Sequence, residues 1–211
     1  LGYKFPANFD SPYLSPDIQD FWRRWHISLS SWLRDYLYIP LGGNRRGNGR
    51  RDVNLMTTMV LGGLWHGASF NFVIWGFLHG IALIVQRGWN NLVARRVPAM
   101  GLIGGFIGGA VTYYWVNLAW IFFRAADLGE ALAISRTYLT WSSTGDNVLP
   151  IAVWPLLAGL GLVHWVSHRF GAQEIIERLG PNRFAVTYGA IAAIAIAFVP
   201  LGYRPFIYFQ F

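Results

Sequence analysis

Apolar and polar positions follow a helical spacing over residues 15–39. Ser15, Pro16 and Asp17 suit an N-cap, a first helical position and an acidic first turn. At about 100° per residue, the tryptophans and other large apolar side chains fall on one face, with Ile27 as the one clear exception, and the arginines fall on the other. The pattern predicts an amphipathic helix over 15–39, which either lies in the membrane interface or packs against the rest of the protein.

Longer apolar blocks follow at 53–85, 100–123, 149–166 and 184–201. The last three are close to the ~20 residues that a membrane-spanning helix needs. Glycines interrupt the first block, which as one straight helix would be about 50 Å long, too long for a hydrocarbon core of ~30 Å. We therefore predict a broken, re-entrant pair, in which residues 53–64 enter the membrane and residues 70–85 return.

The arginines favour this hairpin over a single crossing. With the hairpin, ten loop arginines share one side of the membrane and three lie on the other, whereas a single crossing divides them seven to six. Loops rich in arginine and lysine usually face the cytoplasm. The chain is therefore predicted to cross the cytoplasmic membrane several times, with the loops at 41–52, 86–98 and 167–183 in the cytoplasm.

The composition indicates an all-α integral membrane protein. Hydrophobic residues make up 54% of the chain and charged residues 13%, against about a quarter in soluble domains. The absence of cysteine excludes disulfides and thiolate metal sites. The net charge is +7, and the arginines flank apolar segments without forming one polar face, so we expect contact with lipid headgroups and not with nucleic acid.

His66 lies at the interruption of the first apolar block. An ionisable group at membrane depth is energetically costly and marks a functional site by default. The alternative is a neutral core imidazole bonded to a carbonyl, but the flanking glycines open the backbone around this residue. Desolvation keeps such an imidazole neutral, so that it can accept a proton near neutral pH.

The other histidines give weaker signals. His26 falls at the edge between the two faces of the amphipathic helix, as a second site residue or a structural one. His79 follows His66 by 13 positions, which places it on another helix face, and we interpret it as structural. His164 and His168 close a span and are predicted interfacial anchors. No HExxH motif or carboxylate–histidine cluster predicts a metal.

Other catalytic groups are missing from the sequence. The apolar blocks contain no carboxylate pair, and the chain has no GxSxG nucleophile motif. A neutral histidine at membrane depth suits removal of a hydroxyl proton during acyl transfer, and a dry site disfavours competing hydrolysis. The remaining chemistry therefore points to acyl transfer with His66 as base.

Residues 40–51 form a glycine-rich, strongly basic segment. It lacks the lysine and the serine or threonine of a phosphate-binding P-loop. We interpret it as a membrane-flanking cytoplasmic loop, with binding of an anionic ligand as the alternative.

Three long motifs resemble those of the membrane-bound O-acyltransferases: FWRRWHISLS at 21–30, WLRDYLYIPLGGN at 32–44 and LGGLWHGA at 61–68. The similarity is closest to the bacterial alginate O-acetylation branch, which also includes cellulose acetylation proteins. The terminal PFIYFQF at 205–211 also looks like that branch. Family members are roughly twice as long, so residues 1–211 are expected to be the C-terminal part of one O-acyltransferase domain.

The resemblance implies a multi-span helical bundle around a thinned centre with a tunnel, in a bacterial inner membrane. It makes His66 the catalytic residue and His26 a supporting one. The acyl donor would be acetyl-coenzyme A or a related thioester on the cytoplasmic side, with no bound cofactor. The acetyl group would pass to an exported polysaccharide such as alginate, through a periplasmic partner of the SGNH-hydrolase kind within a synthesis and export complex.

Further candidate residues for binding substrate or donor lie beside the histidines and in the basic segment: Trp65, Trp25, Arg24, Asn71, Arg45 and Arg46. Two other functions compete with an enzyme. A transporter or channel subunit could line an ion path with the broken block, but no second histidine or carboxylate follows as a proton relay. Four aromatic residues also crowd the turn as in a closed tunnel: Trp65, Phe70, Phe72 and Trp75. The other alternative is a catalytically inactive scaffold of a polysaccharide export complex.

Overall fold

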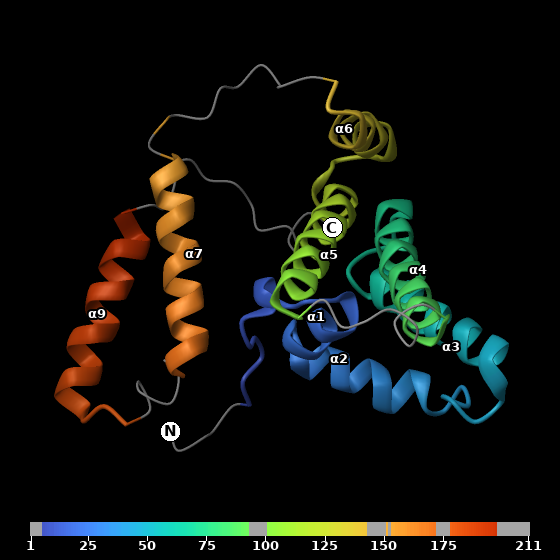
Figure 1. The fold of residues 1–211 in the computed structure, drawn as a ribbon, viewed down its shortest axis with the longest axis horizontal. Helices are drawn as coiled ribbons and strands as arrows, with labels where there is room; N and C mark the ends of the chain where they lie inside the picture. Colours follow the sequence, from blue (N-terminus) through green and yellow to red (C-terminus); the bar gives the residue numbers. More distant parts are fainter. Residues whose placement is uncertain (1–5, 93–100, 143–150, 152, 172–177, 198–211) are drawn as a thin grey trace. The chain divides into compact units, whose positions relative to one another are not determined.

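The computed structural model describes residues 6–92, 101–142, 151, 153–171 and 178–197. All regular elements in these ranges are helical, so the predicted all-α class is confirmed for this part of the chain (Figure 1). The chain divides into two compact units, residues 1–151 and 152–211. Both histidines of the family-like motifs lie in the first unit.

The first unit begins with a short turn, η1 (Pro12–Leu14), and then differs from the single helix predicted over 15–39. The structure divides this range into α1 (Ile18–Arg24), α2 (Ile27–Leu33) and the π-helical turn η2 (Arg34–Tyr38). His26 separates the first two helices with a left-handed φ of 44°, which a helix interior does not accommodate. Asp17 caps α1 by accepting a hydrogen bond from the backbone N–H of Asp20 at 2.8 Å.

Helices α3 (Gly47–Trp65) and α4 (Phe70–Leu92) pack side by side along the first unit (Figure 1). The residues between them, 66–69, form the turn that contains His66. Because α3 begins at Gly47, the second half of the predicted basic loop is helical. Asp52 near the start of α3 forms an ion pair with Arg87 near the end of α4, so the two helices run antiparallel.

Glycines allow α3 and α4 to approach closely. A methyl group at Gly63 would collide with the carbonyl oxygen of Phe72, and one at Gly76 would collide with that of Met59. Backbone this close leaves no space for a side chain, as in other tightly packed helix pairs. The glycines therefore fix where α4 lies against α3, and with it the position of the intervening turn.

Helices α5 (Gly101–Arg124) and α6 (Leu128–Thr140) complete the first unit. Ala119 and Phe122 of α5 form a buried cluster with Trp75 of α4 and Ala131 of α6. Among the described residues, two helices are long and apolar enough to cross a membrane by length and composition, α4 and residues 103–124 of α5. The second unit contains α7 (Val153–Phe170) and α9 (Pro181–Ala197). Residues 100, 149–150, 152 and 198–201 of the predicted spans, and the terminal motif at 205–211, lie outside the described residues.

Candidate active site

His66 lies at the C-terminal end of α3, where the helix gives way to the 66–69 turn. Its backbone N–H donates to the carbonyl of Gly63 at 2.9 Å, so the residue closes the last helical turn. The residue is 7% exposed. A buried polar side chain at a helix end, next to a turn rather than inside a helix, can be approached by a substrate without unwinding the helix.

Aromatic rings enclose the imidazole of His66 on several sides. Its ring centroid lies 4.9 Å from that of Phe123, 5.0 Å from Trp65 and 5.2 Å from Trp75, each nearly perpendicular. Phe72 lies farther away at 6.1 Å. Phe70, which was expected to crowd the turn as well, is 77% exposed. The walls around His66 are thus largely aromatic and apolar.

His26 is held in place by Asn8. Its Nδ1 lies 3.2 Å from the side-chain oxygen of Asn8, which also accepts hydrogen bonds from the backbone N–H and the hydroxyl of Ser28 at 3.1 and 3.0 Å. An amide oxygen only accepts hydrogen bonds, so Nδ1 of His26 is the donor and Nε2 keeps its lone pair. Burial lowers the pKa of His26 below its ordinary value of 6.5, which keeps the ring neutral at neutral pH.

The two histidine motifs meet at a groove. It has a volume of about 320 Å³ and is lined by His26, Ser28, Leu29, Trp32 and Trp65. Trp65 in turn contacts His66, and His26 is close enough to His66 for a charge on one ring to act on the other. Two motifs separated by 40 positions therefore meet at one place, with a groove leading to it.

The other predicted site residues lie in different surroundings. Arg24 is engaged in an ion pair with Asp20 at 2.6 Å. Trp25 packs against Phe21 at 5.6 Å, behind the groove. The side chain of Asn71 donates to the carbonyl of Ala125 at 3.2 Å and joins the start of α4 to the segment after α5.

Arg45 and Arg46 are exposed in the turn before α3, and neither lines a described pocket.

His79, the other described histidine of the first unit, does not line the groove. His79 is 1% exposed, and its Nδ1 accepts a hydrogen bond from the indole N–H of Trp22 at 3.3 Å. His164 and His168 belong to α7 in the second unit. Among the residues that the structure describes, no three histidine, aspartate or glutamate side chains gather as a metal site would require.

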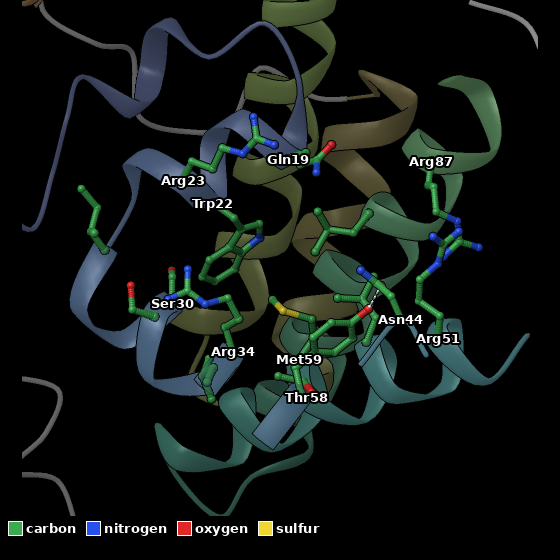
Figure 2. A pocket seen from close by; sticks show the side chains of 16 residues that line it. Gln19, Trp22, Arg23, Ser30, Arg34, Asn44, Arg51, Thr58, Met59 and Arg87 are labelled. Carbon is green, nitrogen blue, oxygen red and sulfur yellow. Dashed lines mark hydrogen bonds between the residues drawn. The ribbon is translucent and has the colours of Figure 1, made fainter. Parts of the chain in front are cut away.

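A second, larger cavity of about 600 Å³ lies between the α1–α2–η2 stretch and the α3–α4 pair (Figure 2). Four arginines line it, and Figure 2 shows Arg51 and Arg87 reaching toward one another from α3 and α4, while Arg23 and Arg34 come from the other wall. We call this cavity the arginine pocket. Its full lining comprises Gln19, Trp22, Arg23, Ile27, Ser30, Ser31, Leu33, Arg34, Tyr38, Asn44, Arg51, Leu55, Thr58, Met59, Leu83 and Arg87.

Sequence reasoning did not find several of these residues. Asn8, which orients His26, and Phe123, which packs on His66, lie far from the motifs and carry no local signal. The pocket arginines were assigned to separate helices and loops, because positions spread over four elements show no common pattern before the chain is folded. The charges at positions 51 and 87, which lie near the same end of the predicted hairpin, were the one available clue.

Comparison with known proteins places the chain in a family. The model of the membrane-bound O-acyltransferase family matches residues 4–125. A probable alginate O-acetylase of Pseudomonas putida is 38% identical over the whole chain, which covers 47% of that protein. A peptidoglycan O-acetyltransferase of Helicobacter pylori is 49% identical over 63% of the chain and 25% of that protein.

A teichoic acid D-alanyltransferase of Streptococcus thermophilus is 38% identical over 42% of the chain. The chain spans less than half the length of these relatives. The matched region contains both histidine motifs, the groove and the arginine pocket. With 122 of its 211 residues matched by one family model, the chain belongs to the membrane-bound O-acyltransferase family.

Proposed function

We propose that the protein is an O-acetyltransferase of a bacterial inner membrane, with His66 as the general base. The observation that carries this proposal is the meeting of the two histidine motifs, with His66 buried among aromatic rings and His26 lining the adjoining groove. Because relatives that match the chain are named as O-acetylating and D-alanylating enzymes, acyl transfer is the chemistry this arrangement supports best.

In the proposed reaction, the imidazole of His66 removes the proton of an acceptor hydroxyl. The hydroxyl oxygen attacks the carbonyl carbon of an acetyl thioester, and the carbon–sulfur bond breaks as the new ester forms. The leaving thiolate takes the proton back from the imidazolium, so the base is regenerated. The aromatic walls keep water from competing with the hydroxyl.

His26 serves in this scheme to orient the acceptor hydroxyl. Its Nδ1–H is committed to Asn8, so the neutral ring offers only the lone pair of Nε2 to the groove. A lone pair accepts a hydrogen bond from a hydroxyl but cannot donate one to a carbonyl oxygen. The geometry therefore favours orientation of the hydroxyl over polarisation of the thioester carbonyl, the other role considered for this residue.

The donor in this proposal is a thioester such as acetyl-coenzyme A, used from the cytoplasmic side without a bound cofactor. The exposed Arg45 and Arg46 in the turn before α3 are placed to attract its negative charge, if that turn is cytoplasmic as the arginine distribution predicts. The protein would then cross the membrane several times, and α4 and α5 are long and apolar enough for two of those crossings.

We further propose that the acetyl group reaches an exported polysaccharide. Relatives named for alginate and for peptidoglycan support a polymer built from sugars. Transfer across the membrane calls for a periplasmic acceptor, and a partner of the SGNH-hydrolase kind within a synthesis and export complex fits that role.

The experiment that tests the function replaces His66 by alanine in cells that O-acetylate the polymer. Acetyl groups on the exported polymer should disappear, while the amount of protein in the membrane stays unchanged. His168→Ala, a histidine on α7 that belongs to none of the family-like motifs, serves as the matched control and should keep acetylation. Acetylation that persists in His66→Ala would overturn the enzymatic role and favour a scaffold or a transport subunit.

A further inference from the structure

The arginine pocket carries more positive charge than its surroundings neutralise. No acidic residue is among its lining residues. Arg34 pairs with Asp35 through bonds of 2.7 and 3.0 Å, and Arg87 pairs with Asp52. Arg23 and Arg51 form no ion pair with any residue that the structure describes. Two of the four guanidinium charges are therefore left for a ligand.

The lack of a partner is clearer for Arg51 than for Arg23. The Nε of Arg51 is buried, with no hydrogen-bond partner among the described residues. Its charge also repels that of Arg87, which lies close to it across the helix pair. Like charges held together in a partly buried site are unfavourable unless an anion lies between them. Asp52 pairs with Arg87 and forms no ion pair with Arg51 among the described residues, so Arg51 is the guanidinium that an anionic ligand would neutralise.

The other lining residues indicate which kind of anion the pocket binds. Neutral polar groups stand near the arginines, among them the hydroxyl of Tyr38, which donates to Asn44 at 2.5 Å. Other parts of the lining are apolar, from Trp22, Leu55 and Met59. A volume of about 600 Å³ is within the range of small-molecule sites and well above that of a simple inorganic anion. The pocket suits an amphiphile with an anionic head and an apolar or extended tail.

We propose that the arginine pocket binds a phosphate ester, whose phosphate lies at Arg51 beside Arg87, whose tail lies along Trp22 and Met59, and whose negative charge is also attracted by Arg23 on the facing wall. Planar guanidinium groups bind phosphate oxygens through paired, charge-assisted hydrogen bonds, which makes arginine the preferred partner of this anion.

The apolar wall leads from this pocket toward His66. Trp22 contacts Trp75 at 5.9 Å between ring centroids, and Trp75 contacts His66 at 5.2 Å. A ligand in the pocket is therefore two ring contacts away from the proposed base. Two sources supply a phosphate ester here, an anionic phospholipid of the bilayer or the phosphate-bearing part of a thioester donor.

Binding measurements on the whole protein in dodecyl maltoside micelles test the proposal and separate the two sources. The first probe is coenzyme A, which carries the phosphates but no acetyl group, and the second is short-chain dioctanoyl phosphatidylglycerol. Arg23→Gln/Arg51→Gln should weaken binding of at least one probe about tenfold or more, the effect of losing one to two charge-assisted hydrogen bonds. Loss for coenzyme A identifies the donor, and loss for the lipid alone identifies a lipid site.

Arg124→Gln/Arg136→Gln is the matched control, because both arginines are exposed on α5 and α6 and the change in charge is the same. This control should bind both probes like the wild type. Arg23→Lys/Arg51→Lys keeps the charges and should retain part of the affinity, which distinguishes lost binding from misfolding. Wild-type affinity for both probes in the glutamine variant, or an equal loss in the control, would overturn the proposal.

The same measurements in the His66→Ala background separate this inference from the proposed function. The pocket arginines do not depend on a base at His66, so binding should persist in that variant whatever becomes of acetyl transfer. Binding lost in His66→Ala while the variant remains folded would contradict an independent phosphate-ester site.

Discussion

The indole N–H of Trp22 on α1 donates a hydrogen bond to Nδ1 of His79 on α4, across 3.3 Å. The acceptor role of Nδ1 places the proton of the neutral imidazole on Nε2. The Trp22 and His79 rings are also nearly perpendicular, with centroids 5.0 Å apart. This contact holds α1 against α4. Because α1 leads to His26 and α4 begins next to the turn that contains His66, the contact helps to place the two motifs relative to each other.

Replacing Trp22 with phenylalanine should leave the buried Nδ1 of His79 without its donor. An unsatisfied buried acceptor costs about 1–3 kcal/mol, and we expect this loss in the free energy of unfolding, measured in detergent micelles. The double variant Trp22→Phe/His79→Phe removes both polar groups and should recover part of the loss. A single variant as stable as the wild type would show that the bond contributes nothing.

Gly76 and Gly88 lie on the same helix, α4, but an added methyl group should have opposite effects on stability at these two positions. Gly76→Ala places a carbon against the backbone of Met59 and Val60 and should separate α3 from α4, at a cost of about 1–3 kcal/mol. Gly88→Ala meets nothing within 4 Å and should stabilise the helix by about 0.5–1 kcal/mol. Thermal unfolding of the two variants compares them directly.

Because Gly76 directly follows Trp75, its substitution should also displace a wall of the His66 site. Acetyl transfer should fall in Gly76→Ala and remain at the wild-type level in Gly88→Ala. Equal stability and equal activity of the two variants would mean that the close approach of α3 and α4 is unimportant to the site.

The break at 66–69 and the break at His26 differ in how far sequence reasoning could foresee them. The glycines around His66 predict an interruption of the helix, because glycine weakens a helix and permits close approach of the backbone. Around His26 the apolar spacing has one exception, Ile27, but no glycine or proline there predicts the left-handed backbone of His26. The tertiary contact with Asn8, 18 positions earlier, compensates for that conformation.

The site shows the same limit of sequence reasoning. His66 and His26 were predicted as a pair because each lies in a long motif. The rings that enclose His66 come partly from α5, and the charges of the arginine pocket come from four elements. Packing of the helices brings together residues that are far apart in the sequence, and a single sequence does not show which of them will meet.

Asn8 is predicted to act through His26, as a positioning residue that fixes its tautomer. Asn8→Ala should leave Nδ1 and Nε2 free to exchange the proton, which lowers the share of rings that present a lone pair to the groove. We expect the rate of acetyl transfer to fall about tenfold or more, as for other groups that orient a functional histidine.

Ser28→Ala is the comparison for Asn8→Ala, because it removes one donor to Asn8 and leaves the bond to His26 in place. Its loss of activity should be clearly smaller. The two variants are compared by the rate of acetyl transfer at saturating donor, together with thermal unfolding to show that both are folded. A larger effect of Ser28→Ala would contradict the tautomer argument.

Because α3 and α4 are antiparallel, the start of α3 and the end of α4 are predicted to lie on the same side of the membrane. The ion pair between Asp52 and Arg87 brings these ends together, so a cysteine at Asn48 and one at Asn90 should be labelled from the same side. The arginine distribution makes that side the cytoplasm. Ser142, which follows α6, should be labelled from the opposite side.

The chain itself contains no cysteine, so single variants can be labelled without background from it. Membrane-impermeant maleimide applied to intact spheroplasts and to inverted vesicles gives the side for Asn48→Cys, Asn90→Cys and Ser142→Cys. If the cysteines at 48 and 90 react from opposite sides, the block between them crosses the membrane once, and His66 would then lie within a crossing segment. Labelling of both from the cytoplasmic side instead places His66 at the inner end of a re-entrant pair, where a donor from the cytoplasm and an acceptor from the periplasm can meet.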